Sequence, residues 1–216
     1  MRRAIFVAVL MSACSSANST GGTQGNVDFS YMGAKLTTTD KPIALGTDAT
    51  IQVKVHSATL YTNATFDSQA PAVLRIDSSA RGPRAGEWFL IVNARSEGTS
   101  RISVGDGAGK VVDTIDLKAS AIAKFELPSS ADVGVAKNVA VEIKARNALG
   151  DELFAPAAID WSVDHPEVVQ FWDSVRNTTQ ASTSGTSLQI HGVALGSAVL
   201  HGVYGKTAVS VPVTVK

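Results

Sequence analysis

Apolar and polar residues alternate one by one in many short segments of the chain, and no long segment has the spacing of an amphipathic helix. Clear examples are Ile51–Val55, Val139–Ala145 and Val209–Val215. Successive side chains of a β-strand point to opposite faces of its sheet, so this alternation is typical of strands with one buried face. Gly, Asp and Asn separate the segments at short intervals. The sequence therefore predicts an all-β fold of the sandwich type.

The two halves of the chain align with each other, which predicts two copies of one unit. The clearest matches are Ile51–Lys54 with Val141–Lys144 and Phe66–Val73 with Trp161–Val168. Each copy has about 90 residues, the size of a seven-stranded immunoglobulin-like β-sandwich. We therefore expect tandem sandwiches over residues 27–119 and 120–216. Few residues separate the expected strands that end near Leu117 and start near Lys124, so we expect a semi-rigid rod.

The first fourteen residues have the pattern of an export signal. Arg2 and Arg3 are followed by the short apolar stretch Ala4–Met11, which is too short to span a bilayer. The segment Met11–Cys14 resembles the lipobox of bacterial lipoproteins, although Leu is more usual at the position of Met11. This resemblance implies that residues 1–13 are removed and that Cys14, the single cysteine, carries a diacylglycerol and an N-acyl chain such as palmitate. An ordinary secretory signal with an incidental cysteine is the alternative.

The residues that follow Cys14 carry further expectations about the anchor. Residues 14–26 have no apolar periodicity and are predicted to form a flexible tether. In the lipoprotein family, Ser15 after the cysteine implies sorting to the outer membrane. Removal of Arg2 and Arg3 would leave two more acidic than basic residues, so nothing in the charge favours nucleic-acid binding.

The second unit carries a more specific pattern: Trp161–Val169 joins a Trp-Ser strand to an Asp-x-Pro-x-Val turn, and Gly196–Leu200 starts a later strand. It resembles the group 2 bacterial immunoglobulin-like (BIG2) domains of surface and envelope proteins. The first unit resembles them less, because Phe66 stands in place of the Trp. The resemblance implies stalk, spacer or adhesive modules with no catalytic residues. Trp161 is expected in the core.

Several residue patterns resemble catalytic, nucleotide-binding or metal sites but are incomplete. Gly105–Lys110 lacks the spacing of a phosphate-binding loop and is predicted to be a hairpin turn. No Gly-x-Ser-x-Gly elbow occurs, and no carboxylate pair faces another across an expected cleft. The four histidines do not have a zinc-site pattern, and His191 and His201 are expected on opposite sheets. We expect no catalytic residues, no metal and no cofactor.

Three surfaces are candidates for binding. Trp88 and Trp172 each neighbour another apolar residue on a strand, so one of each pair is expected to point outward, where a Trp ring could stack on a sugar. The outward row Val199, His201 and Val203, followed by Tyr204, could form a small apolar patch. Arg81 and Arg84, in an expected loop over 78–86, could contact an anionic glycan or lipid headgroup. For each surface, ordinary packing or solvation is the alternative.

These observations lead to one main hypothesis and two alternatives. The main hypothesis is a non-catalytic monomer that is anchored by lipid in the outer membrane of the cell envelope and serves as a spacer or protein-binding module. Pro212 in the last strand and Lys54 and Lys144 on outward positions favour a monomer, because they protect sheet edges. The first alternative is an adhesin that binds envelope or surface polysaccharide. The second is an accessory subunit of an envelope enzyme.

Overall fold

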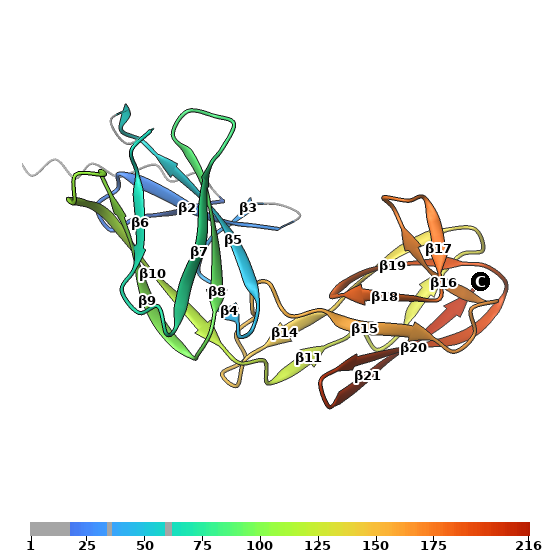
Figure 1. The fold of residues 1–216 in the computed structure, drawn as a ribbon. Coiled ribbons are helices and arrows are strands. Elements are labelled where there is room, and N and C mark those ends of the chain that lie inside the picture. The colour runs from blue at the N-terminus through green and yellow to red at the C-terminus, as the bar shows by residue number, and fades with distance from the viewer. Residues whose placement is uncertain (1–17, 34–35, 59–61) are drawn as a thin grey trace, which may run out of the picture.

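The computed structural model describes residues 18–33, 36–58 and 62–216. Strands β1 to β21 supply its regular structure, so the all-β prediction is confirmed. The strands form two sandwiches with a short two-stranded ribbon between them (Figure 1). Cys14 and the whole expected signal, residues 1–13, lie outside the described residues.

The N-terminal sandwich comprises strands β1 to β10. Its larger sheet has the order β1-β2-β5-β8-β7, with β3 paired to β2, and its smaller sheet has the order β4-β10-β9-β6. Phe29, Tyr31, Ile51 and Leu90 are fully buried between the two sheets. The strands are β1 (Thr20–Gly21), β2 (Val27–Met32), β3 (Leu36–Thr37), β4 (Ile43–Ala44), β5 (Asp48–Val55), β6 (Thr65–Ser68), β7 (Leu74–Arg81), β8 (Glu87–Ala94), β9 (Gly98–Gly105) and β10 (Val111–Ser120).

The C-terminal sandwich and the ribbon comprise strands β11 to β21. The sandwich has sheets of order β12-β21-β20-β15-β18 and β13-β19-β16-β17, and β11 pairs with β14 in the ribbon. Short edge strands divide both sandwiches more finely than seven strands each. The strands are β11 (Lys124–Glu126), β12 (Ala131–Val133), β13 (Asn138–Glu142), β14 (Lys144–Arg146), β15 (Ile159–Val163), β16 (Val169–Asp173), β17 (Thr178–Gln180), β18 (Ser182–Gly185), β19 (Ser187–Gly192), β20 (Gly196–Tyr204) and β21 (Thr207–Val215).

Trp161 lies in the core of the C-terminal sandwich, as the sequence predicts. Its side chain is 2% exposed, and its indole N–H donates a hydrogen bond to the Gly185 carbonyl at 3.0 Å. Gly202 lies directly opposite on β20, where a Cβ atom would come within 2.8 Å of the indole ring. In the N-terminal sandwich the corresponding cross-strand pair is Phe66 and Val104. A larger ring is therefore paired with a smaller partner in the second copy.

Residues 18–26 are not a free tether, and this part of the prediction is wrong. Residues 20–21 form strand β1 on the edge of the larger sheet, and residues 24–27 wrap around the Asp113 side chain. The Asp113 carboxylate is fully buried and accepts hydrogen bonds from the backbone N–H groups of Gln24, Asn26 and Val27 at 2.7–3.0 Å. Because this acceptor lies almost 90 residues away in the chain, local composition could not reveal it.

The two sandwiches meet at a joint held by contacts from both sides. Phe154, which follows the ribbon strand β14, stacks on Tyr31 with ring centroids 4.1 Å apart and an interplanar angle of 10°. Its backbone N–H donates to the Pro42 carbonyl, and its carbonyl accepts from the Ala44 N–H at 3.0 Å. A residue of the predicted second sandwich is thus paired with strand β4 of the first. Burial raises the pKa of the Tyr31 hydroxyl, which donates to the Lys41 carbonyl.

A small hydrophobic cluster and an ion pair complete the joint. Ala44, Ala145 and Leu153 are buried together, and Phe125 packs against them. The Lys41 ammonium donates a hydrogen bond to the Glu152 carboxylate at 2.7 Å, and this bond lowers the pKa of that carboxyl group. These contacts surround the connection between β10 and β11, so they restrict rotation about it.

Candidate functional site

The structure removes Trp88 from the candidate binding surfaces. Its side chain is only 8% exposed and packs edge-on against Phe66, with ring centroids 5.4 Å apart. The Arg81 guanidinium covers the ring at 5.5 Å from its centroid. The reason is the alternation along β8, which places Trp88 on the same inward face as Leu90 and Val92. Phe89 is therefore the member of this pair that points outward, and the assignment of Trp88 as a candidate binding residue is wrong.

Trp172 lies on the outer face of the C-terminal sandwich. Its neighbour Phe171 enters the core, so the alternation along β16 turns Trp172 outward, where it is half-buried. The ring stacks on His191 of the adjacent strand β19, with centroids 5.6 Å apart and an interplanar angle of 29°. The His191 Nδ1 atom is 2.7 Å from the Asn138 side-chain oxygen on β13. Three neighbouring strands therefore hold the indole in one orientation.

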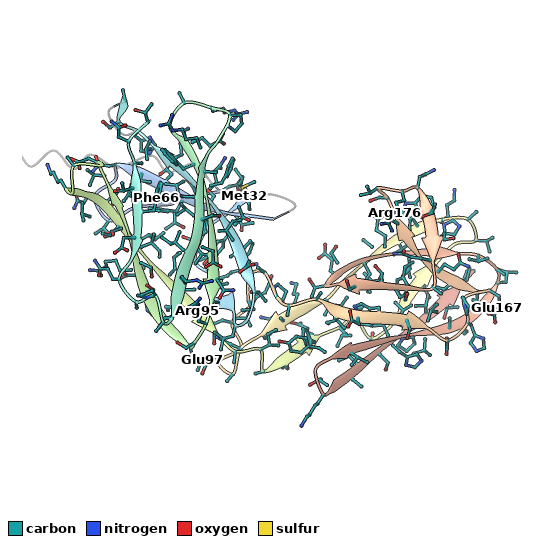
Figure 2. The ribbon with its side chains drawn as sticks, in the orientation of Figure 1. Met32, Phe66, Arg95, Glu97, Glu167 and Arg176 are labelled. Atoms are coloured by element: carbon teal, nitrogen blue, oxygen red, sulfur yellow. The ribbon has the colours of Figure 1, made fainter. Side chains whose placement is uncertain are left out.

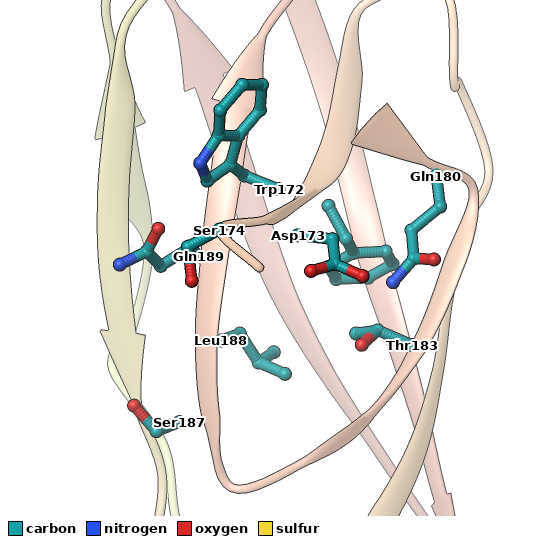
Figure 3. A pocket seen from close by; sticks show the side chains of 9 residues that line it. Trp172, Asp173, Ser174, Gln180, Thr183, Ser187, Leu188 and Gln189 are labelled. Carbon is teal, nitrogen blue, oxygen red and sulfur yellow. The ribbon is translucent and has the colours of Figure 1, made fainter. Parts of the chain in front are cut away.

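A pocket of about 420 Å³ opens beside Trp172 (Figure 3). Phe171, Trp172 and Leu188 are its apolar lining residues, and the other six lining residues are polar. The polar residues are Asp173, Ser174, Gln180, Thr183, Ser187 and Gln189.

Most polar side chains of this pocket have donors and acceptors that are not used in hydrogen bonds to the protein. Within the described residues, the hydroxyls of Ser174, Thr183 and Ser187 and the amides of Gln180 and Gln189 make no hydrogen bond to the protein. Asp173 differs, because its Oδ1 atom accepts from the backbone N–H groups of Val175 and Arg176 and shapes the turn after β16. The Trp172 ring points away from Asp173, Gln180 and Thr183 (Figure 3), because Gln180 pairs with Phe171 and therefore lies on the opposite face of the sheet. Gln189 lies on the same outer face as Trp172.

Sequence reasoning found Trp172 but missed its polar neighbours. Gln189 lies between the buried residues Leu188 and Ile190, so alternation could have placed it on the outer face. Gln180 and Thr183 come from the β17–β18 region, and their positions at the pocket depend on sheet pairing, which sets Gln180 opposite Phe171 and Thr183 opposite Trp161.

The row along β20 is only partly available for binding. His201 and Val203 are exposed, and Val203 is 51% exposed. Tyr204 instead packs edge-on against Phe125, with centroids 5.3 Å apart. Val199 is half-buried, and its backbone N–H donates to Asp164 at 2.8 Å. Two exposed residues remain, so the patch is smaller than expected.

The arginine loop is shorter than expected. Residues 78–81 belong to strand β7, so the loop is confined to residues 82–86. Arg81 is engaged with the Thr62 carbonyl as well as with Trp88. The Arg84 side chain is exposed.

The histidines do not form a metal site in the described part of the chain. No group of three or more His, Cys, Asp or Glu side chains there could hold a metal ion. His191 and His201 lie on different sheets, as expected. His165 hydrogen-bonds Glu167 at 2.9 Å, and this bond raises the pKa of the exposed imidazole.

Gly105–Lys110 is a hairpin turn between β9 and β10, in which the Asp106 carboxylate accepts from the Ala108 and Lys110 N–H groups.

Comparison with known proteins gives similarity only at the level of solved structures. No protein-family model and no curated protein matches the chain. Domains 4 and 5 of the S-layer protein SbsC are 21% identical over 74% of this chain and 79% of that structure, with a TM-score of 0.34. The *Yersinia pseudotuberculosis* adhesin InvE is 12% identical over 93% of this chain and 60% of that structure, with a TM-score of 0.35.

A third structure was solved with a bound sugar. It is SGBP-B of the *Bacteroides ovatus* mixed-linkage glucan utilization locus in complex with a heptasaccharide, 14% identical over 84% of this chain and 44% of that structure, with a TM-score of 0.32. The chain spans less than a third of the longer SbsC structures that it matches. At these TM-scores the function has to be argued from the residues of the chain itself.

No helix among the described residues is long and apolar enough to cross a membrane.

Proposed function

We propose that the chain is a non-catalytic lipoprotein of the bacterial cell envelope that acts as a rigid spacer. The observation that carries this proposal is the joint, where Phe154 stacks on Tyr31 and pairs with strand β4. A joint closed by stacking, backbone hydrogen bonds and an ion pair keeps the far end of the molecule at a set distance from its anchor. Such a construction suits a module that presents a surface rather than one that closes on a substrate.

The anchor is proposed at Cys14 and is tested directly. The native protein is expected to fractionate with membranes and to carry a diacylglycerol and an N-acyl chain on an N-terminal Cys14. A Cys14→Ser variant is expected to leave the membrane fraction, because a protein without acyl chains loses the burial of about 0.8 kcal/mol per CH₂ group. Mass spectrometry that finds an unmodified Cys14 would rule the anchor out.

A specific observation favours a second function, recognition of a carbohydrate at the Trp172 pocket. A sugar ring has apolar C–H faces that pack on an indole, and hydroxyl groups around its edge that need donors and acceptors. The outer face of this sheet offers both, since Trp172 and Gln189 lie on it and the Gln189 amide makes no hydrogen bond to a described residue. We therefore propose a polysaccharide of the envelope or cell surface as its ligand.

Replacement of Trp172 tests the carbohydrate proposal. Isolated peptidoglycan sacculi and the purified surface polysaccharide are each mixed with wild-type protein, and co-sedimentation is measured. We expect saturable pelleting of the wild-type protein with one of them. Trp172→Ala is expected to bind at least about tenfold more weakly, which corresponds to a loss of about 1.4 kcal/mol of binding free energy. His201→Ala, on the opposite sheet, is the matched control and is expected to bind normally. Unchanged pelleting of Trp172→Ala would exclude this site, and no pelleting of wild type would leave the spacer role with a protein partner.

A further inference from the structure

The first described residues lie at the edge of the larger sheet of the N-terminal sandwich, where Asn18 contacts its outer face. The carbonyl of Asn18 accepts a hydrogen bond from the Ser30 hydroxyl at 2.9 Å, and residues 20–21 pair with Asp28 and Phe29. Ser30 lies on the face of β2 opposite to Phe29 and Tyr31, whose rings fill the core. The first described residue is therefore fixed on this outer face.

The covalent chain between this point and Cys14 is short. Only residues 15–17 separate Cys14 from Asn18. Consecutive Cα atoms in an extended chain advance by at most about 3.5 Å, so four steps span at most about 14 Å. A lipidated Cys14 has its acyl chains in the bilayer. The face that carries Asn18 then has to lie close to the membrane surface.

This outer face is more apolar than a solvated sheet face needs to be. Met32, Leu36 and Ile91 are 37–40% exposed, and Phe89 between them is half-buried. Three of the four exposed large hydrophobic side chains described in this sandwich thus lie on one face, and Figure 2 shows Met32 there. Leu36 also lines a groove of about 250 Å³ with Ser19, Lys54 and Arg84.

The charges on this face favour contact with phosphate groups. Lys54 and Arg84 are exposed, and no described residue forms an ion pair with either. The acidic residues of the face are already engaged, because the Asp28 carboxylate lies 3.3 Å from the His56 imidazole and Glu87 accepts a hydrogen bond from the Gln52 amide. Both carboxylate residues are about nine-tenths buried, whereas Asp48 at the other end of β5 is exposed and accepts a hydrogen bond from the Asn93 amide. Lys54 and Arg84 are therefore the accessible charges at their own end of the face.

We propose that this face, defined by Met32, Leu36, Phe89 and Ile91 with Lys54 and Arg84, lies on the phospholipid bilayer in which the chain is anchored. The apolar side chains contact the boundary between headgroups and acyl chains, and the two cations contact lipid phosphates. The inference rests on the proposed lipidation of Cys14. Its consequence is that the N-terminal sandwich is oriented on the membrane rather than suspended from a flexible tether.

Depth-dependent quenching tests this orientation in the lipidated protein. A cysteine is introduced as Ile91→Cys, labelled with an environment-sensitive fluorophore, and the protein is placed in vesicles of phosphatidylethanolamine and phosphatidylglycerol that contain headgroup nitroxide lipid. We expect several-fold stronger quenching than for the control Val175→Cys, which is 93% exposed in the turn after β16 of the C-terminal sandwich. A flexible Gly/Ser insert between Ser16 and Ala17 is expected to reduce the quenching at position 91.

Each outcome separates this inference from the anchor. Intact mass is measured on every sample before quenching. If Cys14 is acylated and the labels at positions 91 and 175 are quenched equally, the membrane-facing orientation is wrong and the lipid anchor stands. If the long insert leaves the quenching at position 91 unchanged, the short chain is not what holds the face to the bilayer. An unmodified Cys14 would overturn the anchor and this inference together.

Discussion

Replacement of Asp113 by Asn is expected to lower the free energy of unfolding of the N-terminal sandwich by about 3 kcal/mol. The buried carboxylate accepts hydrogen bonds from several N–H groups, whereas the amide that replaces it is itself partly a donor. The Asp113 oxygens accept from Gln24, Asn26 and Val27, and also from the N–H of Thr114 at 2.8 Å. The Asn side chain has one oxygen for these donors and directs an NH₂ group at the others. The N-terminal segment of residues 20–27 loses its attachment as a result.

Chemical denaturation and hydrogen exchange measure the two parts of this effect. The amides of residues 20–27 are expected to lose protection more than those of the central strands β5 and β8. Asp116→Asn is the matched control, because Asp116 lies on the same strand but is exposed and bonds to the exposed Arg101. That variant is expected to change stability little. Equal effects of the two substitutions would mean that Asp113 does not organise the N-terminal segment.

Substitution of Gly202 by Val is expected to destabilise the C-terminal sandwich by about 3 kcal/mol, because the new side chain has no room. A Cβ atom at this position would already lie 2.8 Å from both the Trp161 ring and the Val209 side chain. The N-terminal sandwich solves the same packing problem with a smaller ring, since Val104 there faces Phe66. The size of the strand residue and the size of the ring are therefore matched within each copy.

A double-mutant cycle isolates this match. Trp161→Phe alone is expected to be destabilising, because it leaves a cavity and removes the hydrogen bond to Gly185. Combined with Gly202→Val it recreates the pair of the N-terminal sandwich, so the double variant is expected to be more stable than the sum of the single effects implies. Urea denaturation of the four proteins gives the coupling free energy. Strict additivity would show that the ring and the strand residue do not determine each other.

Features of the fold that depend on neighbouring residues could be predicted from the sequence. The alternation in Val209–Val215 indicates a strand without any knowledge of its partner, and β21 follows it. The turn at Gly105–Lys110 is specified by its glycines, of which Gly107 and Gly109 have positive φ. Trp161 could be placed in the core because a large ring flanked by polar residues on a strand has one inward side.

Features that depend on distant residues could not be predicted. Residues 18–26 are polar and lack periodicity, yet a single acceptor at Asp113 makes them part of the sandwich. Phe154 follows a loop with no strand pattern, and only its position against Tyr31 gives it a role. Trp88 and Trp172 have similar surroundings in the sequence, but strand register places the first inside and the second outside.

The distance between spin labels across the joint tests most directly whether the chain is a rigid spacer. Labels are placed at Thr99→Cys on β9 and Ser184→Cys on β18, both exposed positions, in a protein whose Cys14 is replaced by Ser. The pair Ser79→Cys and Thr99→Cys within the N-terminal sandwich serves as the internal reference. The joint contacts predict a single distance distribution across the joint that is about as narrow as the reference. A broad distribution, or several separate distances, would contradict the rigid spacer.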